Sequence, residues 1–585
     1  MIKNLLKDTS AKFIHISALM IIGLIIYANS LHGEFIADDF GSILAHAKAL
    51  STFNLIELWQ AYSTRLIGGL TFAINYQLSH EDVLSYHFFN VMIHILNAVL
   101  FYHFILQIFT TPVGKKSSIV DHAGGVAFLS AVLFLVHPIQ SQAVAYIVQR
   151  YISLATSLCL ASILFYGKAR LMGDKKYYFI SFLFLVFAMF TKESAYPFFI
   201  LIILYDIIFW GKTTASLKRV GAYGLSALLF ISYMLRLSTS RVEQNLFVDY
   251  PSSSMPSLWN LFLTQLNVLR TYFRLLILPY KQSYSYDYNI VSHLDLNTLV
   301  SIILLSSIGI LAVYLYKKNK LIPFFTILWY FLTLSIHALF VIVYGQNGDG
   351  LLNDHWLYLP TAGFALFIVY TLVDLVNIKN ARRILFMVLI VFCVLTFQRN
   401  KVWRSSTTLW ENVVKNNPDR FYHTLGLGGS YQAKGLTEKA YSVYTEALYQ
   451  HRFESIKDML PAQQFYMAQM YFNLGLAANG LGKKDEFISS LHAAVAIAPK
   501  EPFYTYHLGI AYYQLSIPEK AIFYLNQVEK RFQNAPYLHY YLGSAYLQIN
   551  NKVLAKEHLD HALTLFHAAG DVVKEQEVEA MVKKL

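Results

Sequence analysis

The chain has 585 residues, of which 56% are hydrophobic and 14% are charged, and its formal net charge is +12. Such an apolar composition excludes a wholly soluble protein of this size and indicates a membrane protein that carries a further domain. The Lys and Arg residues lie in short clusters between apolar stretches, a distribution that sets membrane topology, so the positive charge does not indicate a nucleic-acid partner.

Apolar stretches of the length that crosses a bilayer, about 17–25 residues, recur from the N-terminus to residue 398. We predict eleven spans, near residues 13–31, 83–108, 123–138, 142–167, 177–192, 195–211, 219–236, 297–316, 321–344, 355–377 and 383–398. The first is expected to remain as an uncleaved helix, because many spans follow it and no small-residue cleavage site is evident. The predicted fold class is all-α, with a polytopic membrane domain over residues 1–398.

Basic residues predict the orientation of these spans. They precede the first span and follow the second, fourth, sixth, eighth and tenth: Lys3, Lys7, Lys12, Lys115, Lys116, Lys168, Arg170, Lys175, Lys176, Lys212, Lys218, Arg219, Lys317, Lys318, Lys320, Lys379, Arg382 and Arg383. All of these clusters fall on one side if the N-terminus is cytoplasmic. We therefore expect a multi-pass protein of the cytoplasmic (inner) membrane of a bacterial cell.

One more apolar segment, Leu258–Pro279, would break this alternation if it crossed the membrane. It carries Arg270 and Arg274 one helical turn apart, and a lipid-facing span avoids such charges. We interpret it as an interfacial or re-entrant helix on the outer side. Eleven crossings then leave the C-terminus outside the cytoplasm.

From about residue 399 charged residues become frequent and a 34-residue period begins. Leu-Gly pairs recur at 474–475, 508–509 and 542–543, and an earlier unit with the same pattern starts at Leu427, separated by a longer helix or insertion at 450–463. Small residues at this period let the two helices of a tetratricopeptide repeat approach closely. We predict four units and a terminal helix near 553–585, forming a second domain over residues 399–585 on the outer, periplasmic side.

Two adjacent carboxylates, Asp38 and Asp39, follow the first span where the chain leaves the lipid. Ionisable side chains are costly at that depth and commonly functional. The alternative is an ordinary solvated turn. The following residues favour a site, because Arg65 lies on an amphipathic segment and His87 and Asn90 fall on one face of the next helix.

Further polar residues are predicted at the outer ends of spans or in outer loops. They are His137, Gln140, Gln142, Arg150, Lys192, Glu193, Arg270, Arg274, Tyr286, Asp287, Asp354 and His355. Cations are normally depleted on that side, and five occur there: Arg65, Arg150, Lys192, Arg270 and Arg274. They indicate an anionic partner such as lipid phosphate. For each cation taken alone, the alternative is a snorkelling side chain or one half of an ion pair. Under this alternative, Lys192 and Glu193 neutralise each other.

Several sequence strings resemble one known family when taken as a set. They are RLIGGLTFAINYQL (65–78), LSYHFFNVMIHILNAVLFY (84–102), HPIQSQAVAYIVQRYISLA (137–155), TKES (191–194), LPYKQSYSYDY (278–288), LYLPTAGF (357–364) and RNKVWRSSTTLWENVVKNNP (399–418). In this order, and placed before the repeats, they resemble the transmembrane and tetratricopeptide repeat-containing O-mannosyltransferase-like proteins. The likeness extends over nearly the whole chain.

The resemblance implies a glycosyltransferase of the GT-C class, with its active site in the first outer loop and a polyprenyl- or dolichyl-phosphate-linked sugar donor. Asp38 and Asp39 match the acidic motif of that class, in which a carboxylate accepts or orients the proton of the acceptor hydroxyl. The five cations are candidates for holding the donor phosphate as its charge develops, and Arg150 matches an arginine of the family's HPI string. No cofactor is required by the spacing; a divalent cation that bridges Asp38 or Asp39 to the phosphate stays an option, as in some enzymes of the class.

Other site candidates are His87, His137, Glu193, Tyr286, Asp287, Asp354 and His355, with the histidines read as hydrogen-bonding core residues rather than metal ligands. The chain departs from the family at two places. Gln140 and Gln142 stand where the family has His and Glu, and Asp354-His355 replaces a Glu-Arg pair. These departures bear on the sugar that is recognised and on any phosphate contact at His355.

We predict a membrane glycosyltransferase that moves a sugar from a polyprenyl-phosphate donor to Ser or Thr hydroxyls of exported proteins, with the acceptor protein docked on the repeats. One alternative keeps the chemistry but uses a lipid or glycan acceptor. Another is a non-catalytic membrane scaffold whose repeats organise an envelope complex. The scaffold is disfavoured, since an anchor needs one span rather than eleven.

Overall fold

The computed structural model describes residues 9–211, 256–286, 288–344, 350–418, 420–450 and 461–585, together with Arg219, Gly221, Tyr223, Gly224, Leu225, Leu228, Ser232, Ile456 and Met459. Most of the span predicted at 219–236, most of residues 451–460 in the predicted insertion, and the site candidate Asp287 lie outside the described residues. Within the described ranges every regular element is a helix, which confirms the all-α fold class. The chain divides into two compact units, Met1–Asn416 and Asn417–Leu585.

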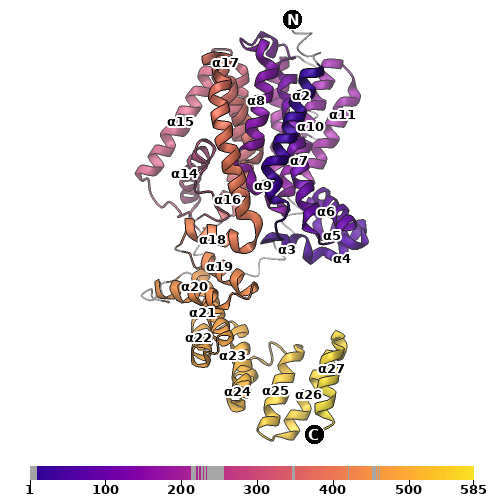
Figure 1. Cartoon of the computed structure of the whole chain (residues 1–585), viewed down its shortest axis with the longest axis vertical. Helices are drawn as coiled ribbons and strands as arrows, with labels where there is room; N and C mark the ends of the chain where they lie inside the picture. The colour runs from indigo at the N-terminus through magenta and orange to yellow at the C-terminus, as the bar shows by residue number, and fades with distance from the viewer. Residues whose placement is uncertain are drawn as a thin grey trace. The chain divides into compact units, whose positions relative to one another are not determined.

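In the first unit, long apolar helices run side by side (Figure 1). They are α2 (Thr9–Tyr27), α7 (Val83–Ile108), α8 (Ala123–Val136), α10 (Arg150–Met172), α11 (Lys175–Met189), α12 (Phe198–Trp210), α14 (Leu258–Ile277), α15 (Leu296–Lys317), α16 (Leu321–Tyr344) and α17 (Tyr358–Asn400). Local signals set their ends: Asp82 caps α7 by accepting a hydrogen bond from the N–H of Leu84, and Gly173 ends α10 in a left-handed conformation.

Seven helices in the described part of the chain are long and apolar enough to cross a membrane, or eight if the pair Val120–Val136 and Pro138–Ala145, bent by 51°, is one broken span. Several helices of this kind indicate a multi-pass membrane protein. The spans predicted at 355–377 and 383–398 correspond to the two parts of α17, which are separated by the non-helical backbone of Asn377. Neither the 15-residue α11 nor α14 is among the seven, and the placement of α14 at the membrane surface stays a prediction.

Short helices gather at one end of this bundle (Figure 1). They are α3 (Asp38–Ser42), α4 (Ala47–Thr52), α5 (Leu55–Tyr62), α6 (Leu66–Ser79), α9 (Ser141–Ala145), η7 (Ile147–Gln149), η12 (Lys401–Arg404) and α18 (Ser406–Asn416). They share a core of their own, in which Ile36, Tyr146 and Trp403 are buried together. This core fixes the loop that carries the acidic pair against segments that are distant in sequence.

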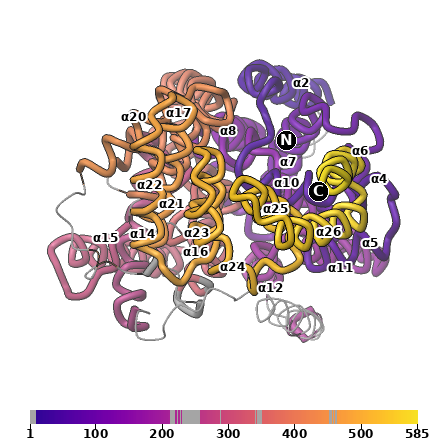
Figure 2. Tube along the Cα trace, turned by 90° about the horizontal axis from the view of Figure 1, so that it is seen from below, coloured from indigo at the N-terminus to yellow at the C-terminus, as the bar shows by residue number. Residues whose placement is uncertain are grey.

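The second unit is a row of antiparallel helix pairs that follow one another in chain order (Figures 1 and 2). The pairs are α19 (Phe421–Ala433) with α20 (Thr437–Gln450), α21 (Pro461–Gly480) with α22 (Lys484–Ile497), α23 (Pro502–Gln514) with α24 (Pro518–Val528), and α25 (Pro536–Gln548) with α26 (Lys552–Ala569), followed by α27 (Val572–Val582). A Cβ atom at Gly509 would lie 2.7 Å from Cγ of Leu525, so the repeat glycines permit the close approach that their period predicts.

Candidate active site at the acidic pair

Asp38 and Asp39 open helix α3 with different surroundings. The Asp39 side chain is fully buried; its Oδ2 accepts a hydrogen bond from the N–H of Ile36 at 3.0 Å and its Oδ1 accepts one from the N–H of Val148 at 2.8 Å. Burial raises the pKa of the Asp39 carboxyl to about 8, although both backbone donors act in the opposite direction. Asp38 is exposed, and its backbone N–H donates to the hydroxyl of Tyr146 at 2.7 Å.

The residue before the pair, Ala37, has a strained backbone with φ 44° and ψ −116°. A residue with a Cβ atom pays roughly 1–3 kcal/mol for such a conformation and keeps it only where the surroundings hold it. Hydrogen bonds lie on both sides of it, from Ile36 to Asp39 and from Asp38 to Tyr146. The Tyr146 ring is itself stacked on Trp403, with centroids 5.4 Å apart. The direction of the Asp38 side chain is therefore set by the tertiary structure rather than by local propensity.

Helix η7 and the residue after it connect three parts of the site. Val148 donates to Asp39, Gln149 accepts a hydrogen bond from Nζ of Lys192 at 3.0 Å, and Arg150 begins α10. Lys192 is only 5% exposed. Helix η7 thus joins a buried ammonium to the acidic loop, because Gln149 accepts from Lys192 and its neighbour Val148 donates to Asp39.

Arg150 is fully buried and bonded to neutral acceptors. Its Nε donates to Asn90 Oδ1 at 2.7 Å, Nη1 donates to Asn75 Oδ1 and to the Thr71 carbonyl, and Nη2 donates to the Tyr86 carbonyl at 2.9 Å. Its guanidinium also lies 4.5 Å from the centre of the Phe72 ring. These contacts tie α6, α7 and α10 together, so Arg150 acts in the structure as a buried brace.

Arg65 and Glu193 form an ion pair across segments that are distant in sequence. Nη2 of Arg65 lies 3.3 Å from Oε1 of Glu193, and the two side chains are 43% and 35% exposed. Their partial exposure leaves the arginine accessible to a ligand. Glu193 follows Lys192 directly in the chain, but its ion pair is with Arg65, whereas Lys192 donates to Gln149.

A second buried cluster surrounds Asp354. The hydroxyl of Tyr286 donates to Asp354 Oδ1 at 2.5 Å, and Nη2 of Arg399 lies 3.9 Å from Oδ2. Arg399 also donates to Asn412 of α18 at 2.7 Å. Sequence reasoning missed Arg399, although it is the first residue of the RNKVW string that directly follows the last apolar stretch.

The remaining predicted histidines have different surroundings. The backbone N–H of His355 donates to Oε1 of Gln142 at 2.8 Å, and its ring interacts electrostatically with Lys192. Nε2 of His137 lies 2.9 Å from the Leu276 carbonyl oxygen, while Nδ1 accepts the N–H of Ile139, so this ring joins α8 to α14. His87 is buried against Gly33.

An apolar cavity of about 450 Å³ lies between α14, α15, α16 and α17. Arg270 and Arg274 of α14 line it together with apolar side chains, among them Leu304, Tyr330 and Phe364. The guanidinium of Arg274 donates to the Tyr280 carbonyl at 2.9 Å and interacts electrostatically with Asp354. Cations at an apolar groove suit an amphiphile with an anionic head group.

A divalent ion at the acidic pair would be held by Asp38. Both oxygens of Asp39 already accept backbone N–H groups, so the exposed carboxylate of Asp38 would bind the ion together with a phosphate of the donor. Among the described residues, the group of three or more His, Cys, Asp or Glu side chains with converging ligand atoms is instead in the repeats: Glu529, His539 and His558.

Comparison with known proteins shows what the chain is similar to. A sequence-family model described as "Tetratricopeptide repeat" matches residues 468–501. The protein O-mannosyl-transferase F38B6.6 of Caenorhabditis elegans is 23% identical over 450 residues, 74% of this chain and 62% of that relative. The protein O-mannosyl-transferase TMTC3 of Mus musculus is 31% identical over 157 residues, 25% of this chain and 16% of the relative. The chain thus aligns with less than two thirds of the length of these relatives.

Solved structures resemble parts of the chain at low similarity. The crystal structure of MamA protein covers 35% of this chain and 94% of its own, at 18% identity and a TM-score of 0.24. YrrB, described as a TPR protein with an unusual peptide-binding site, covers 37% of this chain and 98% of its own, at 15% identity and a TM-score of 0.25. The resemblance predicted from the sequence strings is confirmed: the chain is similar to proteins named protein O-mannosyl-transferase, and a tetratricopeptide repeat model matches residues 468–501.

Proposed function

We propose that the protein is a membrane glycosyltransferase of the GT-C class that moves a sugar from a polyprenyl-phosphate donor to Ser or Thr hydroxyls of exported proteins. The observation that carries this proposal is the connection made by η7 at the loop that follows the first apolar helix. Val148 donates to Asp39, the neighbour of the exposed carboxylate Asp38, and Gln149 accepts from the buried ammonium of Lys192. The names of the relatives make mannose the first sugar to test.

In this proposal Asp38 is the catalytic carboxylate and Asp39 a positioning residue. Transfer to a hydroxyl requires a base that accepts the hydroxyl proton as the bond to the sugar forms. The Asp38 carboxylate is exposed, whereas both oxygens of Asp39 are occupied by backbone N–H groups. Asp39 thereby holds the strained turn at Ala37 that presents Asp38.

The cations stabilise the leaving phosphate. As the bond between sugar and phosphate breaks, negative charge grows on the phosphate oxygens, and fixed positive groups in a site of low dielectric stabilise that charge. Lys192 is buried and bonded to Gln149 of η7, the helix that also binds Asp39, and Arg65 is accessible beside Glu193. We assign the phosphate near the sugar to these two residues, while Arg150 serves as the brace beneath them.

The apolar cavity is proposed to hold the lipid carrier. Its lining by α14 to α17 offers apolar surface to a prenyl chain, and Arg270 lies at the cavity with Arg274 one turn away. Helix α14, which carries both arginines, is bonded to the segment before Asp354, because the hydroxyl of Tyr272 donates to the carbonyl oxygen of Asn353 at 3.2 Å. The repeats are proposed to dock the acceptor protein on the periplasmic side.

The test uses the full-length chain in lipid nanodiscs, supplied with radiolabelled mannosyl-polyprenyl phosphate and a Ser/Thr-rich exported protein. Label that enters the protein fraction and is released by β-elimination is expected, and it should be lost in Asp38→Asn. Glu81→Gln, which removes another exposed acid of the same unit, is the matched control and should keep full activity.

Two other outcomes would replace the proposal. Label that partitions with extracted lipid would assign a lipid or glycan acceptor. If Asp38→Asn and Lys192→Met leave the cellular phenotype unchanged while substitutions on the repeat surface abolish it, the chain is a scaffold.

A further inference from the structure

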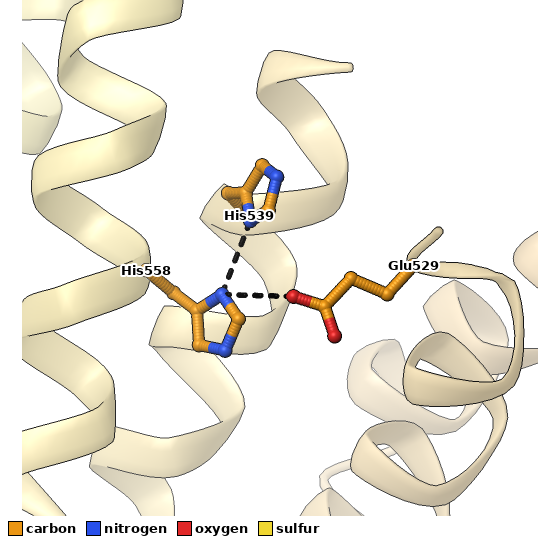
Figure 3. Close-up of side chains that lie close together, drawn as sticks. All are labelled: Glu529, His539 and His558. Atoms are coloured by element: carbon orange, nitrogen blue, oxygen red, sulfur yellow. Dashed lines mark hydrogen bonds and ion pairs between the residues drawn. The ribbon is translucent and has the colours of Figure 1, made fainter. Parts of the chain in front are cut away.

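A cluster of two imidazoles and a carboxylate lies within the repeats, independent of the proposed transferase site. Figure 3 shows Glu529, His539 and His558 converging from three segments: the end of α24, helix α25 and helix α26. Nδ1 of His539 lies 3.1 Å from Nδ1 of His558, and Oε1 of Glu529 lies 4.0 Å from Nδ1 of His558. One potential ligand atom from each residue lies within 4.8 Å of the other two.

The hydrogen bonding of His539 fixes which of its nitrogens is available. Its Nε2 lies 2.9 Å from the carbonyl oxygen of Gln533, and a carbonyl oxygen can only accept. Nε2 therefore carries the proton, and Nδ1 of the neutral ring directs a lone pair toward His558. A histidine whose second nitrogen donates to a backbone carbonyl is oriented as metal-binding histidines are.

The two rings are held in place. His539 is 2% exposed, and the ring of His558 is stacked on Tyr546 with centroids 5.6 Å apart. Two lone pairs cannot face each other at 3.1 Å without a proton or a cation between them. Without metal, the Nδ1–H of His558 donates to His539.

The repeat pattern does not require these residue types. One 34-residue period earlier, the chain has Val495, Thr505 and Tyr524 at the positions of Glu529, His539 and His558. The helix pairs therefore pack without such a cluster. Two histidines and a glutamate at this one junction are an addition to the repeat, and an added cluster with converging ligand atoms points to a ligand.

We propose that Glu529, His539 and His558 bind a divalent transition-metal ion, with Zn²⁺ as the ion that this set of two nitrogens and one oxygen fits. With bonds of about 2.0–2.2 Å, tetrahedral ligand atoms lie about 3.3 Å apart, close to the separation of the two imidazole nitrogens. Binding moves the proton of His558 from Nδ1 to Nε2, so the ring stays neutral. The carboxylate of Glu529, which is partly exposed at the end of α24, approaches by rotation of its side chain.

Such an ion would join the last two helix pairs of the row. Glu529 ends the pair α23 and α24, whereas His539 and His558 belong to the pair α25 and α26. Because each repeat contacts only its neighbours, an added bond at one junction stabilises the units on both sides of it. His561, whose ring centroid lies 4.1 Å from that of His539, is the nearest candidate for a fourth ligand.

The test uses the full-length chain purified in detergent without a histidine tag, stripped with chelator and titrated with ZnCl₂ alone. We expect one tightly bound Zn²⁺ per chain and a rise in the melting temperature of several degrees. Glu529→Gln should weaken binding at least tenfold, and His558→Gln should abolish it. His492→Gln, which removes a repeat histidine bonded to Tyr512 instead, is the matched control and should bind as the wild type does.

Cobalt gives an independent readout that does not depend on stability. Co²⁺ at a tetrahedral site with two nitrogens absorbs in the visible range, and we expect this absorption in the wild type and in His492→Gln but not in His558→Gln. The proposal is wrong if His558→Gln binds Zn²⁺ as tightly as the wild type, or if the wild type gains neither a bound ion nor the cobalt spectrum.

Discussion

Oδ1 of Asp39 accepts a hydrogen bond from the backbone N–H of Val148 at 2.8 Å, joining residues that are 109 positions apart. This bond attaches the acidic loop to helix η7, which also positions Gln149 beside Lys192. The buried member of the pair therefore organises the loop, and the exposed member, Asp38, is the one that we propose as the base. The roles of the two carboxylates can be separated by experiment.

Asp38→Asn should abolish transfer without harming the fold. Removal of a general base lowers turnover by about 10²- to 10⁴-fold, while loss of an exposed carboxylate has little effect on stability. Radiolabel transfer and thermal melting of the same preparation measure both quantities. A variant with wild-type turnover would exclude Asp38 as the base.

Asp39→Asn should change how stability depends on pH. The buried carboxyl has a pKa of about 8, whereas in the unfolded chain it has its ordinary value near 3.8, so between these values the folded state retains a proton that the unfolded state has lost. The contribution of Asp39 to stability is thus largest below pH 4 and falls as the pH rises to 8. Melting curves from pH 5 to pH 8 should show a weaker decline in Asp39→Asn than in the wild type. Parallel curves would contradict the raised pKa.

Arg150→Met should prevent accumulation of folded protein. The substitution leaves the buried oxygens of Asn75, Asn90 and Tyr86 without their donor, and each such group costs about 1–3 kcal/mol. Size-exclusion profiles of a fluorescent fusion should show aggregation. Arg383→Met, at an exposed arginine of α17, provides the comparison and should remain monodisperse.

Arg270→Gln should weaken binding of the lipid carrier at the apolar cavity. The substitution removes the cation and leaves a shorter, neutral polar side chain, so an anionic head group loses its partner while the apolar lining remains. Undecaprenyl phosphate should raise the melting temperature of the wild type, and it should raise that of the variant less. An equal response of the variant and the wild type would place the phosphate elsewhere.

Gly509→Ala should destabilise the repeats, because the added Cβ atom would lie 2.7 Å from Cγ of Leu525. Overpacking of this kind costs about 1–3 kcal/mol. Gly429→Ala is the control, since no neighbouring atom lies within 4 Å of the place that its methyl group would occupy, and alanine favours the helix. Limited proteolysis should cut the repeats of the first variant faster than those of the second.

Much of the fold follows from local patterns. The span predicted at 83–108 coincides with α7, and the 34-residue period predicted the helix pairs, because a period in side-chain size constrains one helix and its neighbour. The two spans predicted at 355–377 and 383–398 are the two parts of α17, which are separated by the non-helical backbone of Asn377. Hydropathy also suggested a crossing at 177–192, where α11 has 15 residues.

The site was only partly accessible from sequence. The order of charged residues along the chain identified Lys192 and Asp354 as candidates. It did not predict that Arg399 and Tyr286 both contact Asp354. The metal cluster in the repeats was missed as well. Glu529, His539 and His558 have spacings of ten and nineteen residues, which match no known ligand motif.

The sequence by itself determined the membrane and repeat architecture, since apolar length and a fixed period act within one helix or between neighbours. Only the tertiary structure decided that Asp39 is buried and Asp38 exposed, and that Arg150 braces three helices. The physical reason is that their burial and hydrogen-bond partners depend on segments 60 to 109 residues apart, and adjacent residues of the same type carry no local signal that distinguishes them.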